Sequence, residues 1–198
     1  MIDFKNLNKA EPYKIFEKYY IEASNLKQSS IEAMALSSFN KISDEVESRY
    51  VNLKYIDNCD FIFFTNYNSL KASNFNEHSQ ISALFYWDKI NIQIRIKANI
   101  FKTSYLFSQE HFINRSKKKN ALAISSRQSK KIDSYEEILT SFKNTLETED
   151  LNNCPDYWGG YSFTPYYFEF WKGNDSRLNK RDVYEMVDSE WHHYILQP

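Results

Sequence analysis

Glycine is so scarce in this chain that its few positions mark where the fold makes an unusual demand on the backbone. The 198 residues contain 3 glycines. All three lie between Trp158 and Gly173, and the turns elsewhere fall on Asn, Asp and Ser. Glycine is needed where φ is positive or where another group comes close to the backbone. We therefore expect this segment to organise the fold.

The segment after the glycine pair predicts a strand with one buried face, because aromatic residues stand among β-favouring neighbours at Phe163, Tyr166, Phe168 and Phe170. Trp171 and Lys172 end this strand, and Gly173 turns the chain. The indole of Trp171 can stack on a ring system, and Arg177 and Arg181, which follow it, can clamp a phosphate. The alternative is a core tryptophan followed by a solvated basic loop.

Composition favours a β-rich core or a large buried interface, because aromatic residues make up 17% of the chain, with 15 Tyr and 15 Phe. A net charge of -1 gives no overall attraction to nucleic acid or membrane surfaces. No run approaches the roughly 18 apolar residues of a membrane span, and the charged N-terminus lacks a signal segment. Cys59 and Cys154 have neither metal-ligand spacing nor the density of a secreted scaffold. We expect a soluble, cytoplasmic protein.

Residue periodicity predicts helices over 11–27, 70–76 and 104–114, and one opened by the capping box Ser134-Tyr135-Glu136-Glu137. It predicts strands over 33–39, 46–55, 59–65, 79–87, 90–101, 163–170, 183–187 and 191–196. Segment 115–131 holds seven basic residues and no acidic one, and we interpret it as a solvated loop. The fold class is mainly β with flanking helices (α+β), an antiparallel barrel forming a single domain over 1–198.

Short motifs then follow one another in a fixed order along the chain. They are Arg49-x4-Lys54, Phe64-Thr65-Asn66, Ser69-x-Lys71, Gln93-x-Arg95, Gln128-Ser129, Trp158-Gly159-Gly160, Phe170-Trp171-x-Gly173 and Arg177-Leu178-x-x-Arg181. Together they resemble the pyridoxamine/pyridoxine 5'-phosphate oxidases over about 11–198. The resemblance implies an FMN-binding split β-barrel that works as a homodimer, with FMN at the interface.

The resemblance also implies which residues contact FMN: Arg49, Lys54, Phe64, Thr65, Lys71, Gln93, Gln128, Ser129, Trp171 and Arg181. These types suit the cofactor, because a phosphate dianion is best held by cations and hydroxyl groups. One departure concerns the phosphate. Leu70 stands where the family has an arginine, which removes one charge-assisted contact.

For the substrate, the resemblance implies that Lys54, Arg115 and Arg177 bind its phosphate or border its ring, with Arg177 the catalytic candidate. Three further substrate-binding positions depart from the family pattern. His111 replaces a tyrosine, Lys119 replaces a serine, and Asn179 replaces a histidine.

The implied activity is an FMN-dependent oxidation of pyridoxamine or pyridoxine 5'-phosphate to pyridoxal 5'-phosphate, with O2 as acceptor and H2O2 released. One alternative is a related flavin oxidoreductase with a different substrate, such as a phenazine precursor. Another is a non-catalytic protein that holds FMN or pyridoxal phosphate. Nucleic-acid binding through 115–131 is a weaker alternative, because the chain as a whole is not basic. No metal site is expected, because the histidines lack ligand spacing.

Overall fold

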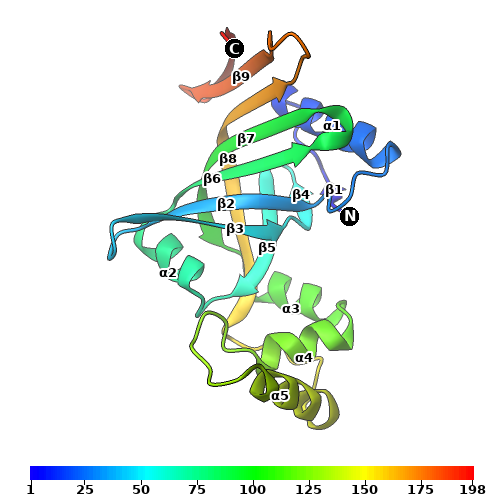
Figure 1. The fold of residues 1–198 in the computed structure, drawn as a ribbon, viewed down its shortest axis with the longest axis vertical. Helices are drawn as coiled ribbons and strands as arrows, with labels where there is room; N and C mark the ends of the chain where they lie inside the picture. The colour runs from blue at the N-terminus through cyan, green and yellow to red at the C-terminus, as the bar shows by residue number, and fades with distance from the viewer.

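A ten-stranded sheet with five α-helices around it makes up the computed structural model, which describes residues 1–198 (Figure 1). The strands are β1 (Asp3–Lys5), β2 (Ala33–Asn40), β3 (Glu45–Asn52), β4 (Tyr55–Asp57), β5 (Asp60–Asn66), β6 (Gln80–Trp87), β7 (Ile92–Lys102), β8 (Trp158–Lys172), β9 (Lys180–Val187) and β10 (Glu190–Leu196). The helices are α1 (Glu11–Asn25), α2 (Leu70–Glu77), α3 (Tyr105–Ile113), α4 (Lys117–Ser125) and α5 (Tyr135–Thr148). The strand order is β1-β4-β5-β8-β7-β6-β2-β3, and β9 pairs with β8 and with β10. None of the helices is long and apolar enough to cross a bilayer.

The longest strand, β8, is the axis of the sheet. Its first residues pair with β5, its last residues pair with β9, and β7 runs beside almost all of it. Buried isoleucines and more exposed polar residues alternate along β7, as expected for a strand with one face towards the core. In Figure 1, β8 runs from the end where α3, α4 and α5 gather to the end capped by β9.

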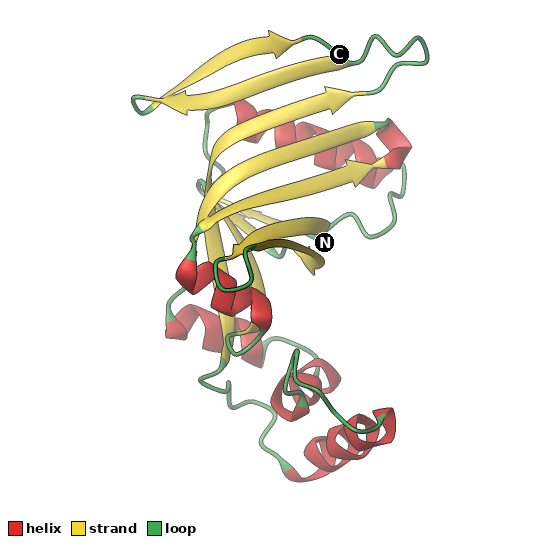
Figure 2. Ribbon diagram, turned by 60° about the vertical axis from the view of Figure 1, so that its left-hand side comes forward, coloured by secondary structure: helices red, strands yellow, loops and turns green.

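The main core forms where α1 lies across the strands (Figure 2). Pro12 sits in the first turn of this helix, where its missing N–H is not needed. Phe16 meets Phe61 and Phe85 edge to face, at centroid distances of 5.2 and 5.3 Å, and Tyr13 packs edge-on against Phe168. The aromatic excess of the composition is thus used in a core of 27 buried residues.

The predicted α+β class and most predicted elements are confirmed, but three expectations were wrong. β1 is not predicted by the sequence and pairs in parallel with β4, so the sheet is not wholly antiparallel. The strand expected over 46–55 ends early, because Leu53 N–H donates to Glu32 and Lys54 N–H to Ile62, which moves the chain to a new neighbour.

The third correction concerns segment 115–131, expected as a loop, which contains α4. A buried amide anchors this helix: Asn120 Nδ2 donates to the carbonyls of Phe112 (2.8 Å) and Leu151 (2.9 Å). Both partners lie outside the helix, so the sequence of 115–131 alone does not predict that this segment is anchored as a helix.

The glycines are required by close contacts, because none of them has a positive φ. A Cβ at Gly159 would overlap the hydroxyl of Tyr67 and lie 2.8 Å from Ser108 Oγ. Tyr67 Oη donates to the Gly160 carbonyl at 3.1 Å, so that ring has a fixed place. Positive φ falls on other residues, among them Asn58 and Asn91, as the turn composition predicts.

We expect Gly159→Ala to lower the free energy of unfolding by about 1–3 kcal/mol, because the added methyl must displace the Tyr67 ring in a packed region. Urea denaturation with an unchanged m-value measures this. The matched control is Gly173→Ala, whose Cβ would meet only the exposed side chain of Asn91. An equal loss in both variants would contradict the role assigned to Tyr67.

Candidate functional site

Eight of the predicted site residues line one cavity of about 490 Å³: Lys54, Phe64, Thr65, Lys71, His111, Arg115, Lys119 and Gln128. They come from the link between β3 and β4, from β5, from α2, and from α3, α4 and the segments that follow each of these two helices. Trp158, at the start of β8, also lines this cavity. The resemblance therefore selects residues far apart in the sequence that the fold brings together.

Lys71 is a buried cation with no carboxylate partner. Its side chain is 7% exposed, and Nζ donates to Thr65 Oγ1 (2.9 Å) and Ser69 Oγ (3.1 Å). Burial, and then the charge of Arg49, lowers the pKa of Lys71 to about 8. An ammonium bonded only to hydroxyls is incompletely compensated, so this corner of the cavity favours an anion.

Arg49 stands beside Lys71 but is partly used by its own chain. Nη1 donates to Ser38 Oγ at 2.8 Å, and Nη2 pairs with Glu47 Oε2 at 2.9 Å. Asn74 Nδ2 donates to the same carboxylate oxygen at 3.1 Å. This network fixes the direction of the guanidinium while its charge still adds to that of Lys71.

Arg115 supplies an unsatisfied donor to the lining of the same cavity. Nη2 donates to the Lys119 carbonyl at 3.2 Å, whereas Nη1 is buried and has no partner. The guanidinium lies 4.3 Å from the ring centroid of Trp158, and burial lowers the pKa of Arg115 to about 10. A buried N–H without an acceptor is costly, so the site fits an incoming anionic oxygen.

Stacked rings form the wall between these cations. Phe64 lies against His111 at a centroid distance of 3.7 Å and against Trp158 at 5.3 Å, with near-parallel planes. Burial, and then the charges of Arg115 and the nearby lysines, lowers the pKa of His111 to about 4. The imidazole is therefore neutral at physiological pH.

Other candidates form a second group, which consists of Gln93, Trp171 and Arg181 on strands and of Arg177 and Asn179 on a loop. Gln93, Trp171 and Arg181 are direct neighbours across β7, β8 and β9. Arg181 Nε donates to the buried carboxylate of Glu169 at 2.8 Å, and Arg95 pairs with the same carboxylate. Arg177 and Asn179 lie on the loop that leads into β9, and Arg177 has a φ of 63°.

The two groups lie at opposite ends of β8. Trp158 belongs to the cavity and Trp171 to the second group, which places them roughly 40 Å apart along an extended strand. One chain therefore does not bring all the predicted FMN contacts to one place.

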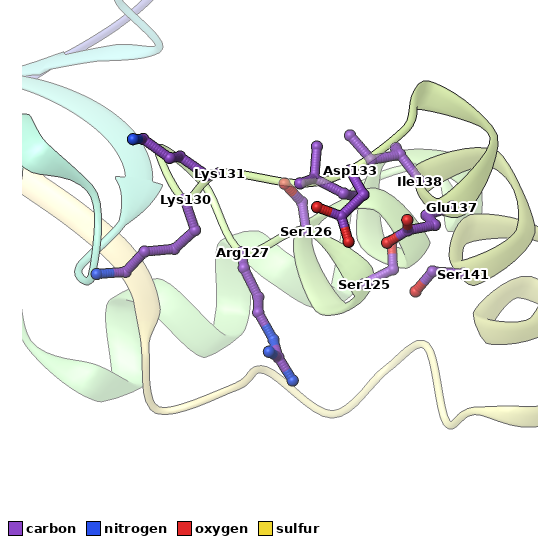
Figure 3. A pocket seen from close by; sticks show the side chains of 10 residues that line it. Ser125, Ser126, Arg127, Lys130, Lys131, Asp133, Glu137, Ile138 and Ser141 are labelled. Atoms are coloured by element: carbon purple, nitrogen blue, oxygen red, sulfur yellow. The ribbon is translucent and has the colours of Figure 1, made fainter.

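Ser129 and the basic segment after α4 lie outside the 490 Å³ cavity. Ser129, with a φ of 70°, lines a neighbouring cavity of about 1030 Å³ together with Gln128 and Leu70. Figure 3 shows a third cavity, of about 350 Å³, in which the side chains of Arg127, Lys130 and Lys131 point away from one another. These three cations do not converge on a single anion site.

Sequence reasoning missed Tyr55 and Glu169. Tyr55 Oη lies 2.7 Å from His111 Nδ1, and Glu169 holds Arg181. A carboxylate between two aromatic residues of a predicted core strand is a signal that could have revealed Glu169, because a buried charge needs a partner. Nothing local distinguishes Tyr55 from the other 14 of the 15 tyrosines.

The donor set fits FMN, because its phosphate needs cations and hydroxyls of the kind that Lys71, Arg49 and Thr65 provide. Lys71 would hold the phosphate and Gln128, whose Oε1 accepts from Thr65 Oγ1 at 3.3 Å, would border it. The binding of a dianion should therefore depend on the proton of Lys71.

We expect FMN affinity to fall as the pH rises above about 8, the pKa of Lys71, approaching a tenfold loss per pH unit. The sign follows because the lysine is charged below this pKa and neutral above it. FMN fluorescence quenching between pH 7 and 10 measures the effect. Lys71→Arg should keep the affinity and remove the pH dependence, and a wild-type profile that stays flat would contradict the assignment.

Comparison with known proteins places the chain in a family. Residues 158–198 match the family described as the pyridoxine 5'-phosphate oxidase C-terminal dimerisation region. The chain is 34% identical to a pyridoxine/pyridoxamine 5'-phosphate oxidase of Rippkaea orientalis, over 95% of this chain and 90% of that protein. It is 32% identical to one of Colwellia psychrerythraea, over 94% and 87%.

Solved structures share the fold. PhzG from Burkholderia lata, in complex with tetrahydrophenazine-1-carboxylic acid, superimposes with a TM-score of 0.90 at 25% identity, over 95% of this chain and 93% of that one. A pyridoxamine 5'-phosphate oxidase-related, FMN binding protein from Nostoc punctiforme gives 0.81 at 13% identity, over 96% and 100%. With the sequence relatives, these matches show that the chain belongs to the pyridoxine/pyridoxamine 5'-phosphate oxidase family of FMN-dependent flavin oxidoreductases.

Proposed function

We propose that this enzyme oxidises pyridoxine or pyridoxamine 5'-phosphate to pyridoxal 5'-phosphate, with O2 as acceptor and H2O2 as the second product. The observation that carries the proposal is the buried, unpartnered Nη1 of Arg115, in a cavity also lined by Lys54 and Lys119. Lys54 pairs with Glu32 at 3.5 Å, but Arg115 and Lys119 form no ion pair, and three cations in one cavity suit a phosphate monoester. The curated relatives that share about a third of the sequence carry the same activity in their names.

The chain's own residues bind and orient. Lys54, Arg115 and Lys119 hold the substrate phosphate, and Lys71 with Arg49 holds that of the cofactor. When bound, FMN supplies the two-electron oxidation at C4' of the substrate. Trp171 and Arg177, from the second group, border the reacting rings, and they contribute by fixing C4' at the correct distance.

The active assembly is a homodimer of single-domain split barrels, in which each site combines the cavity of one subunit with the second group of its partner. Three observations support this. The groups lie at opposite ends of β8, and the matched dimerisation region covers β8, β9 and β10. Large apolar side chains also remain exposed on several elements, including Phe101, Leu106 and Ile195, as expected of an interface. The cytoplasmic location stays a prediction.

Anaerobic addition of pyridoxine 5'-phosphate to the FMN-loaded protein should bleach its visible absorption, and admission of O2 should restore the colour with release of H2O2. The spectrum reports electron transfer to the cofactor directly. Unphosphorylated pyridoxine is the control, because it lacks the group that the three cations bind. A yellow protein that neither phosphorylated vitamer bleaches would contradict the proposal.

A second candidate is oxidation of a phenazine precursor. It is favoured by the likeness to PhzG and by His111, Lys119 and Asn179, which depart from the family pattern. A dihydro- or tetrahydrophenazine carboxylic acid tested in the same anaerobic assay separates the two, since each substrate bleaches the flavin only if the site accepts it.

A further inference from the structure

Tyr55, on β4, is fixed beside the cavity by contacts on two sides. Its hydroxyl oxygen lies 2.7 Å from Nδ1 of His111, and the two rings meet edge to face at 5.3 Å. The ammonium of Lys5 lies 4.5 Å from the centroid of the phenol ring. Both rings of the pair therefore have defined places.

The distance favours the Tyr55 hydroxyl as the donor of this hydrogen bond. A heavy-atom separation of 2.7 Å is the commonest value for a hydroxyl donor and the short limit for an N–H donor. Burial raises the pKa of Tyr55, so the phenol keeps its proton. Burial and neighbouring cations lower the pKa of His111 to about 4, so the neutral ring has one N–H and one lone pair. If Tyr55 donates, the lone pair is at Nδ1 and the proton is at Nε2.

That Nε2–H is available to a ligand. The His111 side chain makes no other hydrogen bond within the chain, its Nε2 is not among the buried atoms left without a partner, and the residue lines the cavity. Phe64 covers one face of the ring at 3.7 Å, which limits its rotation. Arg115, whose Nη1 also lacks an acceptor, lines the same cavity.

We propose that Tyr55 is a positioning residue: it donates to Nδ1, fixes His111 as the Nε2–H tautomer, and so aims one neutral donor at the phosphate that Arg115 and Lys119 bind. The identification of that phosphate as the substrate's rests on the proposed function. A neutral imidazole adds direction to a site whose other donors are charged, so the Tyr55–His111 pair would set how the phosphate is oriented.

The tautomer is tested without any turnover. Two-bond 1H–15N correlation spectra of the histidine-labelled, FMN-loaded protein should show His111 in the Nε2–H form at pH 7. Addition of inorganic phosphate, or of pyridoxal 5'-phosphate, should shift the Nε2 signal. An Nδ1–H form, or no shift with either probe, would overturn the proposal.

Kinetics test the positioning role. We expect Tyr55→Phe to raise KM for pyridoxine 5'-phosphate roughly threefold to tenfold, with kcat and FMN affinity unchanged. In a His111→Phe background the same change should have no further effect, because the partner is gone. The control is Tyr20→Phe, which loses a hydrogen bond from the Ile2 N–H (2.9 Å) outside the cavity and should leave KM unchanged.

The two proposals fail in different ways. A correct tautomer with an unchanged KM in Tyr55→Phe would overturn the positioning role and leave the oxidase function intact. A wild-type protein that turns over neither B6 phosphate would overturn the function, and the phosphate-induced shift at His111 would then decide the positioning role alone. His111→Gln, whose amide N–H can take the place of Nε2–H, should restore much of the affinity lost in His111→Phe.

Discussion

Arg115→Met is expected to raise KM for pyridoxine 5'-phosphate roughly tenfold to a hundredfold while FMN remains bound. The variant removes a charge-assisted hydrogen bond to the phosphate, worth about 1.5–3 kcal/mol. It keeps an unbranched apolar stem but also loses the guanidinium that lies over Trp158. Steady-state kinetics give KM, and the visible spectrum reports the bound cofactor.

The control for Arg115→Met is Lys118→Met, which removes an exposed cation of α4 that does not line the cavity. Its KM should stay close to that of the wild type, because exposed charges interact weakly with a bound ligand. Equal changes in the two variants would mean that the general positive charge of this helix region, rather than the unpartnered Nη1, attracts the substrate.

Mixing two inactive variants is expected to restore activity. Lys71→Met damages the cavity and Arg181→Ala damages the second group, so each homodimer has two impaired sites. A mixed dimer carries both changes in one site and neither in the other. After random exchange of subunits, roughly a quarter of the sites should be intact and active.

This outcome depends on sites shared between subunits. If both groups served one site within a single chain, no mixture would contain an intact site and activity would stay at the level of the separate variants. Mixing Lys71→Met with Arg49→Ala is the matched control, because both changes affect the same group and every site in every dimer keeps one of them.

Local patterns in the sequence were enough for the elements whose signal is local. The alternation of apolar and polar residues along β7 matches the alternation of buried and exposed side chains in the structure. The predicted helix entry at Pro12 is the first turn of α1. Ser134 is the N-cap of α5, as the sequence predicts, since its hydroxyl accepts from the Glu137 N–H at 3.3 Å. These features depend on residues only a few positions apart, so the sequence alone is enough to predict them.

What the sequence did not reveal depends on distant partners. The parallel pairing of β1 with β4 joins Asp3 to Tyr55, and α4 is anchored by an amide that reaches Leu151. The same holds for the site. The family resemblance selected the eight cavity residues, but the pairing of Tyr55 with His111 and of Glu169 with Arg181 is visible only in the structure, because each depends on a contact between elements.

The single strand that bears Trp158 near one end and Trp171 near the other has a consequence for engineering this enzyme. A slip of one residue in its pairing would turn every side chain to the opposite face of the sheet, so Glu169 would lose both arginines while Trp158 left the guanidinium that covers it. Insertions or deletions anywhere between the two tryptophans would damage both halves of the catalytic apparatus together. Redesign of substrate preference is therefore best confined to residues of α3 and α4, which can be changed without altering the register of β8.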